Sequence, residues 1–95
     1  MAYYVYLLTN KPNGTLYIGV TGDLIKRIWQ HRTNALPGFT RTHGIHMLVW
    51  YETHTRIEEA INREKQIKHW ERKWKISLIE ESNHYWRDLF EDICR

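Results

Sequence analysis

The sequence has few of the residues that cross-link a chain or interrupt regular structure, with one cysteine, two prolines and five glycines among 95 residues. Cys94 has no second cysteine to pair with, which excludes an intramolecular disulfide and a paired-cysteine metal site. No apolar run approaches the roughly 20 residues of a membrane-spanning helix. The first residues also lack the basic stretch of a secretory signal peptide. A reducing cytoplasm is therefore the expected compartment.

Acidic residues are in the minority as well. Eleven acidic residues stand against 14 Lys and Arg, which gives a formal charge of +3 at pH 7 and a pI near 9.1. A basic chain favours a polyanionic partner, although many small basic domains bind no nucleic acid. The length and the 42% hydrophobic content suit one compact domain over residues 1–95.

Three stretches have the composition of β-strands. Residues 3–8 are aromatic or aliphatic throughout, which is typical of a strand covered on both faces, and the Asn, Pro and Gly residues of 10–14 predict a hairpin turn. In residues 15–20 aliphatic side chains alternate with others, which places Tyr17 on the less apolar face. A third strand is expected at 46–52.

The first helix is expected after the hairpin, because Leu24, Ile25, Ile28, Trp29 and Leu36 recur at helical spacing. It should end near Pro37 and Gly38. The polar and basic residues 38–44 predict an exposed loop that could touch a phosphate backbone.

Further helices are expected in the second half of the chain. A long helix at 55–73 should be followed by a short one opened by residues 76–79 and by a final amphipathic one. The apolar stripe of the long helix comprises Ile57, Ala60, Ile61 and Ile67, and that of the last comprises Trp86, Leu89, Phe90 and Ile93. The order strand, strand, helix, strand, helix, helix predicts an α/β fold of the α+β type, with a small three-stranded antiparallel sheet flanked by helices.

Glu64 has an unusual position for a carboxylate. At about 100° per residue it falls inside the apolar arc of the long helix, so it faces the core. An inward carboxylate is costly unless it is paired, hydrogen-bonded or bound to a cation. An ion pair with a lysine at the edge of the core is the more ordinary explanation. Glu71, which has a similar bearing one heptad later, is the competing candidate.

Arg27, His31 and Tyr17 are also candidates for a site. Arg27 and His31 are four residues apart and therefore stack on one face of the first helix, at the margin of its apolar side. A snorkelling arginine beside a solvated histidine is the simpler explanation of that pair. The neighbours of Tyr17 two positions away, Thr15 and Gly19, cannot cover it, and Gly19 would let a ligand approach closely.

Phenols, a guanidinium, an imidazole and a carboxylate together suit phosphodiester hydrolysis. That reaction needs a deprotonated water, stabilised negative charge, and a leaving oxygen that is protonated or bound to a metal. A tyrosine base has the difficulty that its free pKa of about 10 makes the phenolate unfavourable by roughly 4 kcal/mol at neutral pH. Arg27 and a metal ion could offset that cost, and His31 could accept the phenol proton.

Two tyrosine triplets give the chain a resemblance to a known family. Tyr4-Val5-Tyr6 stands where the GIY of GIY-YIG nucleases stands, and Tyr17-Ile18-Gly19 matches the YIG. The family's first-helix signature is resembled by Thr21, Asp23, Leu24, Arg27 and His31. Glu64 resembles the residue of its metal-binding helix, and Asn83 resembles its final polar motif. The departure is Tyr4 in place of glycine. The resemblance spans nearly the whole chain and is closest to the small stand-alone bacterial members and to the nuclease domain of the eukaryotic structure-selective junction endonuclease.

The resemblance implies an endonuclease that hydrolyses phosphodiester bonds in DNA. Glu64 would bind one divalent cation, Mg²⁺ or alternatively Mn²⁺. The implied substrate is branched or damaged DNA in repair or recombination, and a protein partner could supply specificity.

The resemblance also implies roles for the remaining site residues. Tyr17 would contact or activate the nucleophilic water, with Tyr6 and His31 supporting the proton transfer, and Arg27 would hold the scissile phosphate. Asn83 would orient or contact the substrate. Which phenol is the base stays open, because the hairpin register decides whether Tyr6 and Tyr17 share a face.

Other classes of protein are weaker matches. A non-catalytic nucleic-acid-binding module of the same fold is the main alternative. The presence of all five core site residues argues against it, and these are Tyr6, Tyr17, Arg27, His31 and Glu64. A zinc protein is disfavoured because the histidines lack paired cysteines and a familiar ligand spacing. Aromatics at helical spacing are more often core than a protein-binding surface. The residues behind these last two alternatives are His43, His46, His54, His69 and His84, and Trp70, Trp74 and Trp86.

Overall fold

The computed structural model describes residues 1–33, 35 and 38–95. Its elements in chain order are β1 (Tyr3–Thr9), β2 (Leu16–Thr21), α1 (Leu24–Arg32), α2 (Phe39–Thr42), β3 (Met47–His54), α3 (Ile57–Lys68), α4 (Arg72–Ser82) and α5 (Phe90–Ile93). The three strands lie where the sequence predicts them, within two residues at each end.

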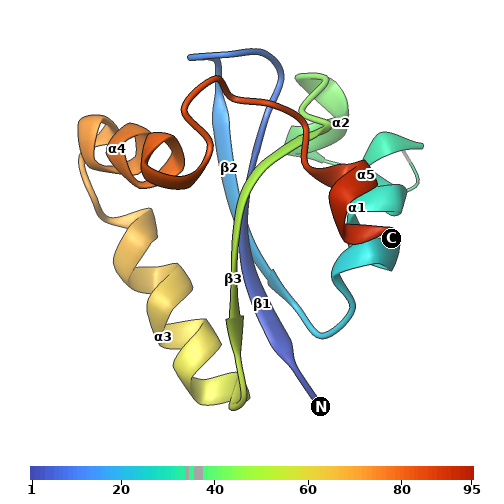
Figure 1. Ribbon diagram of the computed structural model, residues 1–95, viewed down its shortest axis with the longest axis vertical. Helices are drawn as coiled ribbons and strands as arrows, with labels where there is room; N and C mark the ends of the chain where they lie inside the picture. Colours follow the sequence, from blue (N-terminus) through green and yellow to red (C-terminus); the bar gives the residue numbers. More distant parts are fainter. Residues whose placement is uncertain (34, 36–37) are drawn as a thin grey trace.

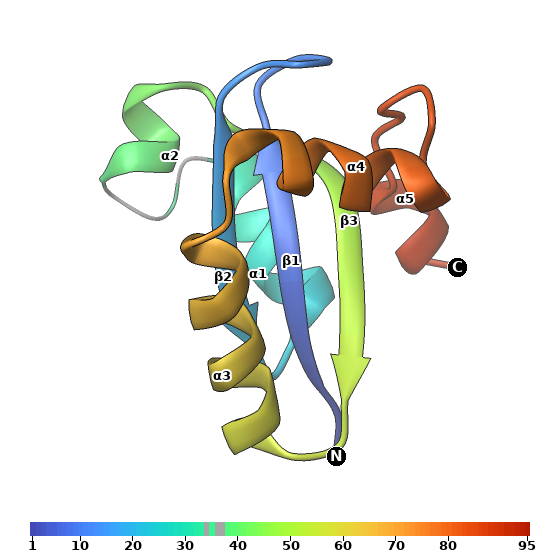
Figure 2. The same ribbon diagram turned by 90° about the vertical axis from the view of Figure 1, so that its left-hand side faces the viewer.

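The strands form one antiparallel sheet in the order β2-β1-β3. Helices α3 and α4 lie on one face of this sheet, while α1, α2 and α5 lie on the other (Figure 1). Turned by 90°, the view shows α3 and α4 passing in front of the strands (Figure 2). The predicted α+β fold and the covering of the first strand on both faces are therefore confirmed.

Alternation along β1 creates two hydrophobic cores. Val5 and Leu7 pack toward α3 and α4, whereas Tyr6 and Leu8 pack toward α1. The first core is completed by Val49, Trp50, Ala60, Ile67, Ile79 and Trp86, and the second by Leu24, Ile28, Ile45 and Leu48. Residues 5–9 of β1 are buried, so β1 is the central strand that separates the two cores.

The first helix is shorter than predicted. It ends at Arg32, because the Thr33 hydroxyl donates to the Trp29 carbonyl and caps the last turn. The predicted positions Leu36 and Pro37 lie outside the described residues. Ile25 and Trp29 are on the exposed side of α1 rather than in the core.

The predicted exposed loop at 38–44 is partly wrong. Residues Phe39–Thr42 form the short helix α2, and Thr40 is only 5% exposed. The Thr40 hydroxyl contacts His31 on α1.

The predicted long helix ends five residues early, and the next helix begins before its predicted opening at 76–79. After α3 ends at Lys68, the chain turns, and α4 begins at Arg72. The Arg72 guanidinium donates to the carbonyls of Asn13 and Gly14 at 2.8 and 2.6 Å, which anchors the turn to the β1–β2 hairpin. Hydrogen bonds to a hairpin almost sixty residues away outweigh the local helical preference of this stretch.

Some predicted apolar positions do not face a core. On α3, Ala60 and Ile67 are buried, but Ile57 and Ile61 are exposed, so the stripe that touches the sheet is narrower than predicted. Trp86 is buried against the α3 and α4 side, but a positive φ of 59° removes it from any helix. The last helix, α5, therefore covers only Phe90–Ile93.

Candidate active site

The two site tyrosines lie on the same face of the hairpin. In the β1–β2 register Tyr6 is opposite Gly19 and Leu8 is opposite Tyr17, so both phenols point toward α1 and their ring centroids are 6.5 Å apart. A Cβ atom at Gly19 would collide with the ring and the oxygen of Tyr6. Glycine is thus required there because the Tyr6 ring lies across its backbone. The register question that the sequence leaves open is settled in favour of a shared face.

His31 lies between the phenols and the second core. It is 4% exposed, and its Nε2 is 3.3 Å from the Tyr6 hydroxyl, while its Nδ1 is 3.0 Å from the Thr40 hydroxyl. Its ring centroid is 5.7 Å from that of Tyr17. His31 is therefore not the solvated histidine of the simpler explanation, since burial and two hydroxyl contacts hold its imidazole against the phenols.

Burial decides the protonation of this pair. Burial first, and then the neighbouring Tyr17, raises the pKa of Tyr6 well above its ordinary value, although the charge of Arg27 acts in the opposite direction. Burial, Arg27 and His46 lower the pKa of His31 to about 4. At neutral pH the folded protein holds a protonated phenol beside a neutral imidazole.

A cleft of about 390 Å³ opens along the outer edge of β2. Tyr6, Tyr17 and Arg27 line it from the α1 side of the sheet, and Glu64 lines it from α3 on the other side. The other lining residues are Leu7, Leu16, Ile18, Gly19, Val20, Lys68 and Lys75. The cleft therefore collects polar groups from both faces of the sheet around an edge strand.

Glu64 is half-buried and has one buried carboxylate oxygen, as its helical position predicts. It lies on the same face of α3 as Ala60 and Ile67, which are in the core. Its Oε2 is buried and has no hydrogen-bond partner among the described residues, so the ordinary alternative of a lysine ion pair is not what this carboxylate makes there. The competing Glu71 is instead exposed and lies 3.5 Å from Lys73.

The environment of Glu64 fits a single cation. A buried carboxylate oxygen without a protein partner is costly unless a cation or a proton binds it. Among the described residues no group of three or more His, Cys, Asp or Glu side chains is placed to hold a metal. The site therefore offers a cation one carboxylate oxygen, which is compatible with a divalent ion that keeps waters and binds substrate phosphates.

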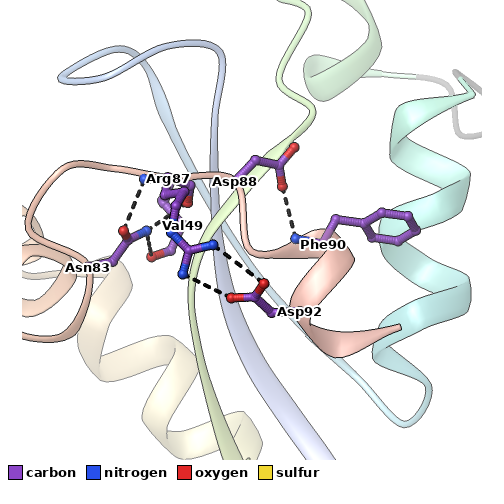
Figure 3. A network of polar contacts seen from close by, with 6 residues as sticks. All are labelled: Val49, Asn83, Arg87, Asp88, Phe90 and Asp92. Atoms are coloured by element: carbon purple, nitrogen blue, oxygen red, sulfur yellow. Dashed lines mark hydrogen bonds and ion pairs between the residues drawn. The ribbon is translucent and has the colours of Figure 1, made fainter. Parts of the chain in front are cut away.

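Asn83 is not brought into the cleft. It caps α4, where its Nδ2 donates to the carbonyls of Val49 and Arg87 and its Oδ1 accepts from the Arg87 amide. Figure 3 shows this network beside the Arg87–Asp92 ion pair and the Asp88 cap on the Phe90 amide. These bonds give Asn83 a structural task, which is to fasten the C-terminal segment to β3.

Comparisons with known proteins show the family of this chain. A family model described as the GIY-YIG catalytic domain matches residues 2–77. The chain belongs to the GIY-YIG family. It is similar to a UPF0213 protein of Staphylococcus haemolyticus, 35% identical over 79 residues that span 83% of this chain and 95% of that one. It is also similar to a UPF0213 protein of Clostridium perfringens, 40% identical over 76 residues that span 80% of this chain and 81% of that one.

A solved structure of a similar protein has the same overall fold. The solution NMR structure of a UPF0213 protein from Bacillus halodurans aligns with a TM-score of 0.58 and 30% identity over 96% of both chains. Membership of the GIY-YIG family supports a nuclease that binds DNA, and nucleases of this family generally depend on a divalent metal. None of the helices described for this chain is long and apolar enough to cross a membrane.

Three residues around this GIY-YIG site were missed by the sequence reasoning. Lys68 is four residues after Glu64 and therefore on the same helical face, so its spacing was an available signal. Lys75 reaches the cleft from α4, beyond a turn that lies earlier in the chain than the sequence predicts. Thr40 contacts His31 through packing of α2 on α1, for which no pattern in the sequence gives a signal.

Proposed function

We propose that the protein is a divalent-metal-dependent endonuclease that hydrolyses phosphodiester bonds in DNA at the β2-edge cleft. The observation that carries the proposal is the meeting of the Tyr6, Tyr17 and Arg27 side chains with the buried, unpartnered Oε2 of Glu64 in one cleft. A phosphodiester and a cation are complementary to that set of groups. Membership of a nuclease family supports the same reaction.

Each side chain has a task that follows from its placement. Arg27 is half-buried at the cleft wall and would hold the scissile phosphate through its guanidinium. Tyr17 is more accessible than Tyr6, which is 1% exposed, so Tyr17 would contact the attacking water. Tyr6 and His31 lie behind it and would take up the proton that the water loses.

Glu64 would hold the cation. A bound Mg²⁺ or Mn²⁺ would neutralise charge on the phosphate and lower the pKa of a bound water. Glu64 itself would anchor the ion through the oxygen that has no other partner among the residues described here.

The cleft favours recognition of a DNA backbone over recognition of bases. Lys68 and Lys75 add two cations on the α3 and α4 side, opposite Arg27. Lysines and arginines bind phosphates without reading sequence, so the cleft suits DNA chosen by its shape. We therefore propose branched or damaged DNA in repair or recombination as the substrate, with specificity supplied in part by a protein partner.

The test is cleavage of labelled branched, nicked, single-stranded and duplex DNAs in Mg²⁺ or Mn²⁺, with Glu64→Ala and Glu71→Ala measured in parallel. We expect metal-dependent products that Glu64→Ala abolishes and that Glu71→Ala, an exposed glutamate on the following turn, leaves unchanged. Full activity of Glu64→Ala would remove Glu64 from the reaction. Salt-sensitive DNA binding without cleavage of any substrate would favour the non-catalytic binding module.

A further inference from the structure

Thr40 is a buried hydroxyl placed behind the imidazole of the proposed site. It lies on α2, is 5% exposed, and its Oγ1 is 3.0 Å from Nδ1 of His31. The other ring nitrogen, Nε2, is 3.3 Å from the Tyr6 hydroxyl. The imidazole is thus held between two hydroxyls, one on each nitrogen, which fixes the plane of the ring.

The two contacts restrict how the ring can be protonated. A neutral imidazole carries one N–H donor and one acceptor nitrogen, and burial keeps the His31 imidazole neutral at pH 7. If Nδ1 carries the hydrogen, it donates to Thr40, and Nε2 is left as an acceptor for the Tyr6 O–H. Burial also keeps the Tyr6 phenol protonated, so that phenol has a proton to donate.

We infer that Thr40 is a positioning residue for the proposed hydrolysis: its hydroxyl accepts the Nδ1–H of His31 and so leaves Nε2 unprotonated and directed at Tyr6. The inference rests on the proposed function and deepens it. A group outside the cleft thereby selects the tautomer that a base needs, as second-shell hydrogen bonds to histidine do in other sites.

In this tautomer a proton can pass from the attacking water through Tyr6 to His31. The Tyr6 hydroxyl proton moves to Nε2, and the Tyr6 oxygen takes a proton from the water at Tyr17. The hydroxide oxygen bonds to phosphorus while the bond from phosphorus to the leaving oxygen breaks. That oxygen takes a proton from solvent, to which the imidazolium later returns its own. The Nδ1–H bond to Thr40 is retained throughout and stabilises the imidazolium.

Substrate binding should make His31 a better base. The charged and titratable groups that face it are Tyr6 from β1, Tyr17 from β2, Arg27 from α1 and His46 from the segment before β3. A phosphate bound to Arg27 cancels a positive charge that disfavours the imidazolium. The imidazole therefore gains basicity when DNA occupies the cleft.

The test compares Thr40→Val, which keeps the shape but loses the hydroxyl, with Thr40→Ser, which keeps the hydroxyl. We expect Thr40→Val to lower kcat by roughly 10- to 100-fold at little change in KM, and Thr40→Ser to stay within a few-fold of the wild type. Wild-type kcat in a folded Thr40→Val protein would overturn the inference.

A second readout does not depend on activity. The ¹⁵N resonances of the His31 ring report its tautomer, and we expect an unprotonated Nε2 and a protonated Nδ1 in the wild type and in Thr40→Ser. Loss of that preference in Thr40→Val would support the role, even if the variant is less stable. A protonated Nε2 in the wild type would overturn it. If no DNA is cleaved by the wild type, the proposed function fails while the tautomer measurement still decides the arrangement of His31.

Discussion

The two faces of the sheet are built from one central strand but bury different chemistry. Toward α3 and α4, β1 directs Val5 and Leu7 into a core of aliphatic and tryptophan side chains. Toward α1 it directs Tyr6, whose hydroxyl lies beside the buried His31, and His31 in turn contacts the buried Thr40. One face therefore has an apolar core, while the other also buries polar groups that we propose take part in the reaction.

The two faces meet at the edge of β2. There the phenols and Arg27 come from one side and Glu64 from the other. Beside an edge strand such as β2, side chains from the two faces of the sheet can line the same cleft, because no further strand separates them. Apart from Glu64, Lys68 and Lys75, which line the cleft from the α3 and α4 side, the difference between the faces predicts that substitutions toward α1 will change the reaction and substitutions in the core toward α3 and α4 will change stability.

Among substitutions on the α1 face, the largest fall in kcat is expected for Tyr17→Phe. Tyr17→Phe removes the hydroxyl that contacts the proposed water, so kcat should fall roughly 100-fold or more with little change in KM. Rates are measured on the best substrate of the DNA panel, with Tyr85→Phe as the control because Tyr85 is fully outside both cores at 85% exposed. A rise in KM at constant kcat would instead make Tyr17 a binding residue.

The opposite face should respond in stability. Ile67 is fully buried against the sheet, so Ile67→Ala should lower the free energy of unfolding by about 2–5 kcal/mol. Ile61→Ala on the exposed side of the same helix should cost about 1 kcal/mol or less. Urea denaturation measures both, and kcat of folded Ile67→Ala should remain near that of the wild type. Equal costs for the two isoleucines would contradict the assignment of this core.

His31 should make stability depend on pH. Its pKa is about 4 in the folded protein and 6.5 in an exposed reference, so between those values the unfolded chain binds a proton that the folded chain does not. Stability is then highest above pH 6.5 and falls as pH drops toward 4, by about 3 kcal/mol.

The matched variants are His31→Gln and His69→Gln, the second at an exposed histidine after α3. Unfolding free energies at pH 7 and pH 5 should show a weaker acid loss for His31→Gln than for the wild type, and an unchanged loss for His69→Gln. The same acid loss in all three proteins would show that His31 titrates normally.

Much of the site is predictable because it depends on local geometry. Strand alternation gives the face of Tyr17, the four-residue spacing stacks Arg27 with His31, and the helical bearing of Glu64 turns it inward. These features need only the period of an element. Each is present in the structure where the sequence places it.

The features that were not predicted depend on contacts between distant segments. The position of the break between α3 and α4, earlier than predicted, is anchored by Arg72 on the hairpin carbonyls, and α2 brings Thr40 to His31 across a stretch without a strong periodic pattern. Trp86 fits a helical spacing in the sequence, but its positive φ angle shows that it is not part of a helix. Packing partners, rather than propensities, decide these three places.

The Asn83 network gives the sheet two unlike borders. The β2 border carries the cleft, whereas along β3 the Leu89 amide donates to the Leu48 carbonyl at 2.8 Å and Asn83 takes the carbonyl of Val49, the extra residue of a β-bulge. These are backbone groups that an open border would offer to a strand of another molecule. The segment after α4 therefore pairs these groups within the chain and leaves fewer of them for another strand, on the border opposite the cleft.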